Sequence, residues 1–598
     1  MARFNERNVS ETYKAAEHFR RECLLRNGSL LFEGTDLWSA ENLAKLHKAF
    51  VEAPDTGTRS FTEKFRDQVT PAGQTVLRLA AEALSVYFLF PSNVGGFRKR
   101  ELVSEVLGWG GDTLPSDNDV FRAFERGIGS GGQGFNTRRP WELGFLISFV
   151  HVWKKLRAPE QAKALSDPWK FKELLDATEE GAENKQMRHM LLHLLFPDEF
   201  ERIASGRHKR RILEAFSGLV EDAEQDDDKN LLVVRRALEK LLPGKELDFY
   251  WEPLRGAWHD LSDAGEDDLA PLELVHHKKQ VVLFGPPGTG KTYSAKLLAE
   301  RIIRSAALKS MGPTRYFKDL AVVDAAVKDA NVHRLQLHPA YSYEDFIRGL
   351  HVAEGGATEY RLGYLPLLAK EIKESKAEPR LPHVLILDEI NRTDLSRMLG
   401  EAFSLLEDRN QVVELPARGK GGEKMAFSIP ADLYVIGTMN LIDQSIEQVD
   451  FALRRRFLWI ECPFDPEALV EASKAIWGDK QAGQDWDRVE PDFRKLATAA
   501  TLLNQEVKKS PLLGAQYEIG HTYFFDVVSF LVNYLEASRR GRKNMLWSKK
   551  DALQPVHQVW RLSLRPLLHE YLSGLDAGAR EAELKRLGEV FLTPPAAE

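Results

Sequence analysis

The chain has 598 residues, of which 43% are hydrophobic and 29% are charged, and its formal net charge at pH 7 is −7. This composition is typical of a globular protein, and the length suggests about three or four domains. The acidic balance excludes a protein that binds nucleic acid through its overall charge, so any such site has to be a local basic patch.

The chain has two cysteines, Cys23 and Cys462, which are too few for a disulfide framework or a cysteine zinc site. This fits the reducing environment of the cytoplasm. The charged N-terminus leads into no apolar stretch, so we expect no signal peptide. Because no run of about 18 apolar residues is present, we also expect no membrane span and a cytoplasmic location.

Residues 1–160 are expected to form an N-terminal recognition domain. Two segments in it, 95–100 and 127–141, combine glycine with arginine and aromatic residues. A flexible loop of this kind can bind phosphates through arginine and stack on bases through its rings, which favours contact with DNA. The alternative is an ordinary surface loop before the apolar helix predicted at 143–153.

Residues 165–260 are expected to form a helical intermediate domain, since apolar residues recur there at helical spacing. Its basic cluster at 207–211 suits either a phosphate backbone or a solvated helix face. The acidic run at 221–228 is typical of an exposed connection between helices. Residues 260–269, with their acidic residues and glycine, predict a linker into the next domain.

The most specific motif lies at residues 285–292, after the apolar run 280–284 that predicts a buried strand and before a predicted helix. This is the context in which the pattern G-x-x-x-x-G-K-[ST] binds a nucleoside triphosphate. Backbone N–H groups of the loop surround a phosphate, Lys291 reaches the β- and γ-phosphates, and Thr292 holds Mg²⁺. The residues expected to contact the nucleotide are Gly285, Pro286, Pro287, Gly288, Thr289, Gly290, Lys291, Thr292 and Tyr293.

A predicted strand at 335–337 is followed by a glycine-containing excursion at 351–367 that interrupts the helical pattern. This insertion is expected to be either a loop that faces a substrate or a pore, or a hairpin without a function of its own.

The apolar run 384–387 precedes Asp388 and Glu389. It predicts a central strand of a parallel sheet with two carboxylates at its C-terminal end. Asp388 is expected to support Mg²⁺, and Glu389 to orient and polarise the attacking water, because phosphoryl transfer depends on positioning and charge stabilisation. Residues 396–407 are expected to form one helix.

A third strand, 433–438, leads to Asn440. The amide of Asn440 is expected to lie beside Asp388 and Glu389 and to touch the γ-phosphate or the attacking water, the alternative being a turn residue. Residues 411–429 predict a β-hairpin with an exposed basic turn.

Residues 450–457 predict a helix that carries Arg454, Arg455 and Arg456 in a row. Adjacent residues on a helix point in different directions, so the three arginines cannot serve one site. At least one is expected to reach the γ-phosphate of a neighbouring subunit as an arginine finger, with Arg455 and Arg456 as the candidates. Salt bridging within the subunit is the alternative.

Together these motifs resemble the AAA+ ATPase superfamily, and within it the McrB-type restriction ATPases, over roughly residues 270–575. The resemblance implies a multidomain α/β protein with a P-loop parallel-sheet domain at 265–465 and a C-terminal helical lid at 466–598. Mostly helical or mixed domains precede these two, and His521 in the lid is expected to be structural. The selective matches are the segments 338–346, 388–392, 437–440, 452–457 and 519–524.

The resemblance also implies a homo-oligomer, commonly a hexameric ring, that uses Mg²⁺ with ATP or GTP. An N-terminal domain would recognise DNA, often modified DNA, and a separate McrC-like nuclease subunit would cut it. No motif decides between ATP and GTP. The family pattern Asn-Thr-Ala-Asp-Arg-Ser begins here at Asn440 but has Gln444 in place of its arginine, so stimulation of hydrolysis by a partner is the property that this departure affects.

Two functions remain open at this point. The segments around Arg98 and Arg138 favour an NTP-driven subunit of a modification-dependent-type DNA restriction and phage-defence system. The net charge of −7 favours a MoxR-like ATPase that remodels protein complexes. A nucleotide-switched scaffold with negligible turnover is disfavoured by Glu389.

Overall fold

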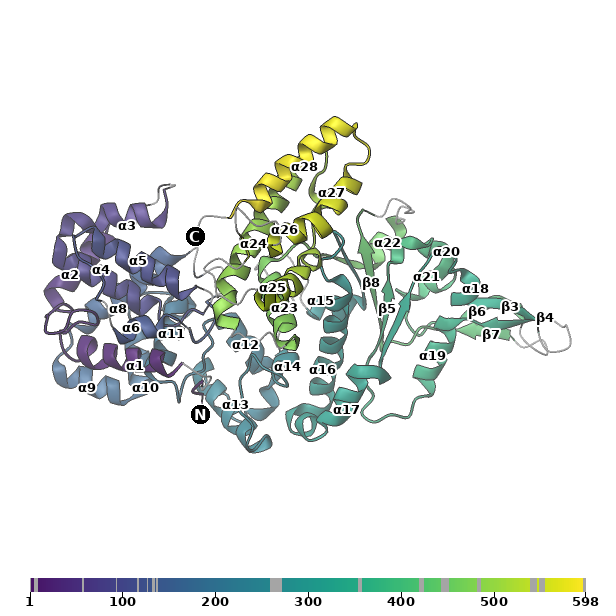
Figure 1. Ribbon diagram of the computed structural model, residues 1–598. Helices are drawn as coiled ribbons and strands as arrows, with labels where there is room; N and C mark the ends of the chain where they lie inside the picture. Colours follow the sequence, from purple (N-terminus) through teal and green to yellow (C-terminus); the bar gives the residue numbers. More distant parts are fainter. Residues whose placement is uncertain are drawn as a thin grey trace. The chain divides into compact units, whose positions relative to one another are not determined.

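The chain folds into two compact units in a computed structural model (Figure 1). Unit 1 comprises Met1–His259 and Gly312–Lys318, and unit 2 comprises Asp260–Met311 and Asp319–Glu598. No helix in the described ranges has both the length and the apolar character needed to cross a membrane. The structure describes residues 2–4, 9–55, 57, 59–92, 94–115, 118–125, 127–131, 135, 138–258, 272–352, 358–418, 424–442, 451–480, 486–537, 546–547 and 554–594.

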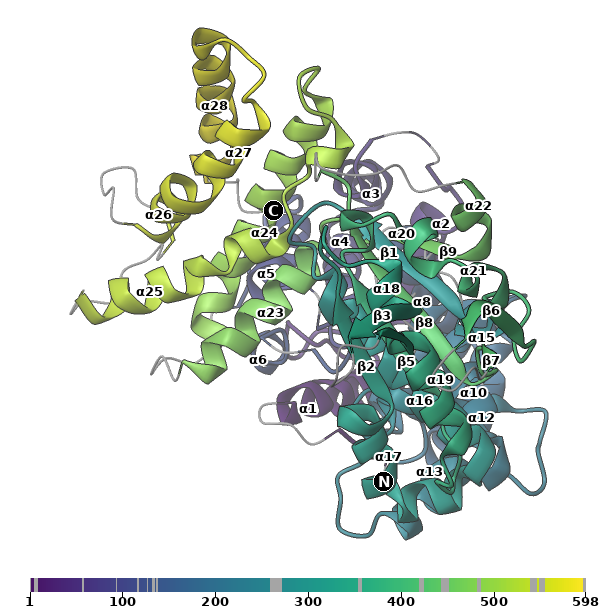
Figure 2. The same cartoon turned by 90° about the vertical axis from the view of Figure 1, so that its right-hand side faces the viewer.

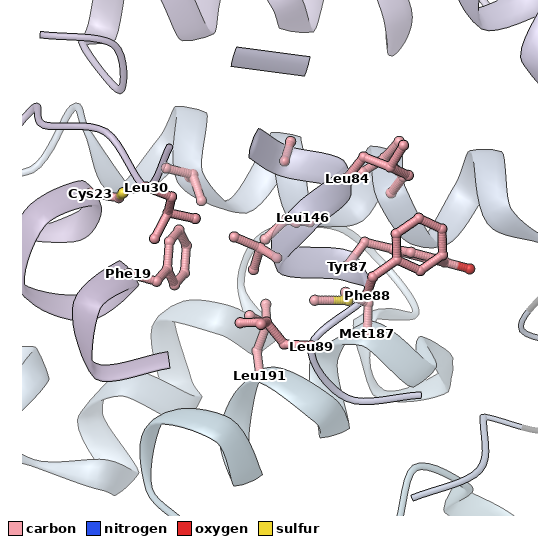
Figure 3. Close-up of a cluster of buried hydrophobic side chains, with 14 of the residues drawn as sticks. Phe19, Cys23, Leu30, Leu84, Tyr87, Phe88, Leu89, Leu146, Met187 and Leu191 are labelled. Atoms are coloured by element: carbon pink, nitrogen blue, oxygen red, sulfur yellow. The ribbon is translucent and has the colours of Figure 1, made fainter. Parts of the chain in front are cut away.

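Unit 1 is helical and has an apolar core that includes residues from Val9 to Ala204. Helix α4 (Gln74–Tyr87) lies in this core, and α8 (Arg139–Trp153) is also buried along most of its length. Figure 3 shows how aromatic and aliphatic side chains from several helices interlock there. The other helices used below are α2 (Ala40–Phe50), α3 (Phe61–Val69), α5 (Gly96–Gly108), α11 (Gln186–Leu195), α12 (Gly206–Ala215) and α13 (Asp227–Leu241).

The mostly helical character expected before the P-loop domain is confirmed. The division into separate domains at 1–160 and 165–260 stays a prediction. The core described above includes side chains from both of these ranges.

The basic cluster at 207–211 is only partly at the surface. Lys209 of α12 is buried, where its ammonium contacts the carboxylate of Asp228 in α13 and lies 2.9 Å from Nδ1 of His189. Arg188 donates from Nη1 to the other oxygen of Asp228 over 3.1 Å. Neither interpretation of the cluster, as a phosphate-binding site or as a solvated helix face, therefore applies to Lys209. Its buried ammonium is instead stabilised by a buried carboxylate.

The acidic run at 221–228 is likewise not simply an exposed connection. Asp226 caps α13 by accepting hydrogen bonds from the backbone N–H groups of Asp228 and Lys229. Asp228 lies within the first turn of the helix and is buried. Its two cationic neighbours hold the pKa of its carboxyl well below the usual range, although burial by itself acts in the opposite direction.

Substitution Asp228→Ala tests this buried network. It leaves Lys209 and Arg188 without their shared carboxylate, so we expect the free energy of unfolding to fall by about 3 kcal/mol or more. Urea denaturation of the full chain, followed by tryptophan fluorescence, measures the loss. Asp227→Ala, at the exposed neighbouring position, is the matched control and should leave stability almost unchanged. Equal stability of the two variants would contradict the prediction.

Unit 2 contains a five-stranded parallel sheet with the strand order β2-β5-β8-β1-β9. Its central strands are buried on both faces, as their apolar, β-branched sequences predict. This order places β8, which ends at Asn440, between β1, which leads into the P loop, and β5, which ends at Asp388. The strands are β1 (Gln280–Gly285), β2 (Val332–Gln336), β5 (His383–Asp388), β8 (Leu433–Asn440) and β9 (Leu458–Glu461).

Two antiparallel hairpins accompany this sheet: β3 (Arg348–Val352) with β4 (Thr358–Leu362), and β6 (Val413–Arg418) with β7 (Lys424–Phe427). The hairpin predicted at 411–429 is confirmed, and its tip at 419–423 lies outside the described residues. Figure 1 shows both hairpins at one end of unit 2.

The helix predicted at 396–407 is wrong in one respect, since two short helices are present, α20 (Leu395–Leu399) and α21 (Ala402–Leu405). Gly400 separates them with a φ of +48°, and a Cβ there would lie 2.5 Å from the ring of Tyr343. Helical spacing alone does not reveal this close approach of a distant ring.

The C-terminal helical lid is confirmed, and its helices share a core of their own. Figure 2 shows these helices in green to yellow. They are α23 (Pro466–Asp479), α24 (Trp486–Lys509), α25 (Asp526–Ala537), α26 (Pro555–Val559), α27 (Arg565–Tyr571) and α28 (Ala577–Leu592).

Candidate nucleotide-binding and hydrolysis site

The P loop joins the end of β1 to the start of α16 (Lys291–Lys318). Gly288 and Gly290 have φ values of +78° and +75°, a left-handed backbone that glycine adopts at little cost. Lys291 is buried, and its ammonium donates to the carbonyl oxygens of Gly285 at 3.2 Å and Pro286 at 2.6 Å. The loop thus holds a positive charge against its own carbonyl groups, ready for a phosphate.

The predicted loop residues do not share one environment. Thr289 is buried and its hydroxyl donates to the carbonyl oxygen of Pro286 over 3.0 Å, which closes the turn. Tyr293, in the first turn of α16, is exposed, so its part in nucleotide binding remains a proposal.

Asp388 is the meeting point of three elements. This carboxylate is buried, and its Oδ1 accepts hydrogen bonds from the hydroxyls of Thr292 at 3.1 Å and Thr438 at 3.0 Å. Its Oδ2 accepts from Nε of Arg334 over 2.5 Å. Because β8 and β2 are the two neighbours of β5, the sheet itself brings Thr438 and Arg334 to the carboxylate.

The oxygen atoms of Thr292 and Asp388 fit a magnesium ion. Mg²⁺ prefers hard oxygen ligands and is usually bound through one or two carboxylates together with substrate phosphates and water. The described residues contain no group of three or more His, Cys, Asp and Glu side chains that could form an all-protein metal cage. We therefore propose Thr292 and Asp388 as the protein residues that hold the ion beside a bound triphosphate.

Glu389 follows Asp388 in a strained turn. Its φ of +59° lies in the left-handed region, which is uncommon for a residue other than glycine and costs of the order of 1 kcal/mol. Its N–H donates to the Thr438 hydroxyl over 3.1 Å. Its carboxylate is partly exposed, accepts from Nε2 of Gln336 over 3.2 Å and pairs with Arg392 at 3.1 Å. The two adjacent carboxylates therefore have different partners, which is compatible with the separate roles predicted for them.

Asn440 ends β8 opposite Gly285 of the P loop in the parallel register. Its carbonyl oxygen accepts a hydrogen bond from Nδ2 of Asn391 over 2.8 Å, which ties the end of β8 to the segment after Glu389. The sheet thus places Asn440 between the two nucleotide motifs, and contact with the γ-phosphate stays a prediction. Gln444, the departure from the family pattern, lies outside the described residues.

The three arginines of α22 (Phe451–Arg456) have different surroundings. Arg456 is buried, pairs with Glu407 at 3.2 Å and lies 4.1 Å over the ring of Phe403. Arg454 lies over the ring of Trp459. Arg455 is exposed and makes no ion pair with another described residue. Arg455 is therefore the better candidate for a finger that acts on a neighbouring subunit.

The lid contacts the P loop directly. The N–H of Thr522 donates to the carbonyl oxygen of Gly288 over 3.0 Å, and a Cβ on Gly520 would lie only 2.1 Å from the carbonyl carbon of Gly288. His521 is buried, which lowers the pKa of its imidazole, and its Nε2 lies 3.1 Å from where a Cβ on Gly290 would be. The segment 519–524 thus contacts the P loop at the candidate nucleotide site, as expected of a lid.

Sequence reasoning also missed the residues that hold the two carboxylates. Arg334 and Gln336 are two positions apart on β2, so they share one face of the strand. The alternation is visible in the sequence. The register that sets them beside Asp388 and Glu389 is not, because it depends on the pairing of β2 with β5.

Comparisons with known proteins agree with this geometry. The family model for the AAA domain (dynein-related subfamily) matches residues 320–457, and the model for the McrB alpha-helical lid domain matches residues 495–578. The chain is 33% identical over 257 residues to the type IV methyl-directed restriction enzyme EcoKMcrB subunit of Escherichia coli K12, a match that covers 42% of this chain and 49% of that subunit.

Two further similarities are weaker. The ATPase family gene 2 protein of Schizosaccharomyces pombe is 30% identical over 174 residues, which cover 27% of this chain and 20% of that protein. The match to a crystal structure of a candidate ATPase from Cytophaga hutchinsonii covers 54% of this chain and 79% of that chain. The sequence identity over this match is 14%. Its TM-score of 0.22 is too low to support an argument about the fold.

The parallel sheet and the match over residues 320–457 show that the chain contains an AAA+ domain, the class of domain that hydrolyses nucleoside triphosphates. Within that class its AAA domain and its lid are of the McrB type, as the resemblance of the motifs predicts. The chain spans about half the length of the Escherichia coli subunit that it matches.

Substitution Glu389→Gln keeps the shape of the side chain but removes the carboxylate that would polarise water. We expect nucleotide binding to be retained and phosphate release to fall by roughly 10²-fold or more. Fluorescent nucleotide binding and a phosphate-release assay measure the two quantities separately. Lys291→Ala serves as the variant that does not bind, and Glu414→Gln, on the exposed hairpin, as the variant that behaves as wild type. Unchanged phosphate release in Glu389→Gln would remove this residue from its role.

The surroundings of Arg455 and Arg456 predict different effects of substitution: loss of activity for Arg455 and loss of stability for Arg456. Arg455→Ala should lower kcat by roughly 10³-fold without loss of stability, as expected for an arginine finger. Arg456→Ala should lower the free energy of unfolding by about 2 kcal/mol, because it loses an internal ion pair and a ring contact.

Mixing distinguishes action between subunits from action within one. An Arg455→Ala chain mixed with a Lys291→Ala chain should recover part of the activity, because each supplies what the other lacks. Phosphate release measured over a range of mixing ratios gives the result. If the mixture is as inactive as the separate variants, Arg455 does not act across subunits.

Proposed function

We propose that the chain is the NTP-hydrolysing subunit of a modification-dependent-type DNA restriction and defence system, which recognises DNA through its N-terminal region and drives a separate McrC-like nuclease. The observation that carries this proposal is the McrB-type lid in the same chain as an AAA domain in which Thr292 of the P loop contacts the buried Asp388. The similar Escherichia coli protein is a methyl-directed restriction subunit.

The proposed cycle uses the contacts described above. On binding, phosphate oxygens replace the loop carbonyls as partners of Lys291, and the loop N–H groups surround the phosphates. When bound, Mg²⁺ would neutralise charge on the β- and γ-phosphates. Glu389 would orient and polarise the attacking water, and Asn440 would fix the γ-phosphate end.

We further propose that the site is completed in a homo-oligomeric ring. An exposed Arg455 is suited to reach a nucleotide bound by a neighbouring subunit. The direct contact of the lid with Gly288 gives a route by which nucleotide exchange would move the lid. Both features fit a motor that couples hydrolysis to the work of a partner, with ATP or GTP as its fuel.

Fewer residues are available to contact DNA than the composition of segments 95–100 and 127–141 suggests. Lys99 is fully buried, donates to the carbonyl oxygen of Pro91 over 2.6 Å, and burial lowers its pKa to about 7. Phe135 is also buried and stacks on Tyr87 with ring centroids 4.4 Å apart. Lys99 is therefore unable to bind phosphate, and Phe135 is unable to stack on a base.

Two exposed rings remain, Phe97 at 70% exposure in the first turn of α5 and Trp141 at 62% in the first turn of α8. Arg98 directly follows Phe97, and Arg138 lies three positions before Trp141. Both helices start near the segment that follows α4: Lys99 of α5 donates to the carbonyl oxygen of Pro91, and Arg139 of α8 lies 5.7 Å over the ring of Phe88. Exposed rings beside arginines are the combination that grips unpaired bases and phosphates. Residues 132–134, 136 and 137 lie outside the described residues.

The second candidate, a MoxR-like ATPase that remodels protein complexes, is favoured by the charge pairing in the same region. Arg98 pairs with Glu101 at 2.6 Å, and Arg100 pairs with Glu125. Together with the net charge of −7, these pairs reduce the attraction for a phosphate backbone. This candidate requires a protein client for the N-terminal region and no affinity for DNA.

Fluorescence anisotropy of the full chain with unmodified and methylated duplexes, at two salt concentrations, separates the two candidates. The DNA proposal predicts binding that weakens steeply with salt, because phosphate contacts release counterions. Trp141→Ala should weaken it by about tenfold, as expected for the loss of one stacked ring. The chain alone should leave the duplex uncut.

Leu562→Ala, an exposed apolar residue of the lid, is the matched control and should bind DNA as wild type does. Absence of binding to every duplex at low salt would overturn the DNA proposal in favour of a protein client. Binding that Trp141→Ala leaves unchanged would move the contact away from this surface.

A further inference from the structure

The carboxylate of Asp388 is shared between two kinds of partner. Both threonine hydroxyls, of Thr292 and Thr438, donate to Oδ1. Oδ2 accepts a hydrogen bond from the guanidinium of Arg334, through Nε at 2.5 Å. One oxygen thus faces the P loop and the sheet, and the other is occupied by a positive charge.

Arg334 reaches this oxygen from the edge of the sheet. It lies on β2, which pairs with β5 alone, and its register partner is Ile386, two positions before Asp388 on the same face. The Arg334 side chain is 46% exposed, whereas that of Asp388 is 2% exposed. The carboxylate is therefore fixed, and the arginine has solvent into which it can move.

A buried carboxylate without a counter-charge is unfavourable, because burial removes the water that would stabilise its charge. Magnesium bound at Thr292 and Asp388 would supply that charge. Without the ion, Arg334 supplies it. A guanidinium and a divalent cation also repel one another at short distance, so both cannot neutralise one carboxylate at the same time without a cost.

We propose that Arg334 is a positioning residue of the hydrolytic site that holds Asp388 when magnesium is absent and competes with the ion for it. Arg334 thereby sets the magnesium concentration at which the site binds nucleotide tightly. This inference rests on the proposed magnesium site but on neither DNA recognition nor the nuclease partner.

The proposal gives Arg334 two effects of opposite direction. It keeps the metal-free site ordered, with Asp388 aimed at the P loop. It also raises the magnesium requirement, because the ion has to displace the guanidinium before Asp388 can support it. Removal of the charge should therefore make the protein bind metal more tightly but leave the metal-free site less stable.

The test is the binding of a fluorescent nucleotide by the full chain as magnesium is titrated. Arg334→Met keeps the aliphatic stem and removes the guanidinium. The magnesium concentration at half-maximal affinity should fall by about fivefold, the effect of losing one partly exposed ion pair. Electron paramagnetic resonance with Mn²⁺ in place of Mg²⁺ counts free and bound ion directly and should give the same shift without any hydrolysis.

Arg380→Met is the matched control, because Arg380 also pairs with one carboxylate of this unit, that of Asp432 at 2.6 Å, and is largely exposed. It should leave the metal titration unchanged. Arg334→Lys keeps the charge and should stay near wild type. In an Asp388→Asn background, Arg334→Met should no longer shift the metal titration, since its partner is gone.

An unchanged or increased magnesium requirement in Arg334→Met would overturn the proposal. So would the same shift in the Asp388→Asn background. If Arg334→Met does not fold, Arg334→Gln gives the same test with a polar replacement. Loss of DNA binding in the wild type would contradict the restriction proposal but would leave this result unaffected, so the two failures are distinguishable.

Discussion

The buried carboxylate of Asp388 is the constraint on which the rest of the site depends. A charge that is removed from water has to be neutralised and hydrogen-bonded by the protein or by a ligand. The strand order of the parallel sheet meets this requirement, because β8 and β2 flank β5 and bring Thr438 and Arg334 to the carboxylate. The P loop adds Thr292 from the other side of β8. The strand order of the sheet therefore decides which residues meet at Asp388.

The P loop also contacts the lid. Gly288 of the P loop and Gly520 of the lid lie so close to the opposite element that neither position has room for a Cβ. A triphosphate that enters the loop would change the surroundings of Gly288 and, through its hydrogen bond with Thr522, those of the lid. Direct contact between the two elements gives such coupling a physical path.

Much of the AAA+ part of the fold could be predicted from sequence, because its information is local. The P loop, the run before Asp388 and the strand before Asn440 each carry their own pattern of apolar residues and turn residues. Features that depend on pairing between distant segments could not be predicted. Arg334 meets Asp388 only through the register of two strands, and Lys209 meets Asp228 only through helix packing. The break at Gly400 similarly depends on Tyr343.

In the N-terminal region, too, the sequence does not show which side chains the packing of distant segments buries. Composition indicated basic, aromatic segments, but packing removes Lys99 and Phe135 from the surface and leaves Phe97 and Trp141 exposed. Which residues of a basic segment are available to a ligand is decided by the core beneath them. In this unit the core uses several of the residues that a surface reading would assign to DNA.

We propose that Lys291, Thr292 and Asp388 form a magnesium-dependent nucleotide site. The most direct measurement is the affinity of the unmodified full chain for non-hydrolysable ATP and GTP analogues, with and without Mg²⁺. We expect at least one analogue to bind, and Mg²⁺ to tighten its binding. Binding of neither analogue, or binding that Mg²⁺ leaves unchanged, would contradict it.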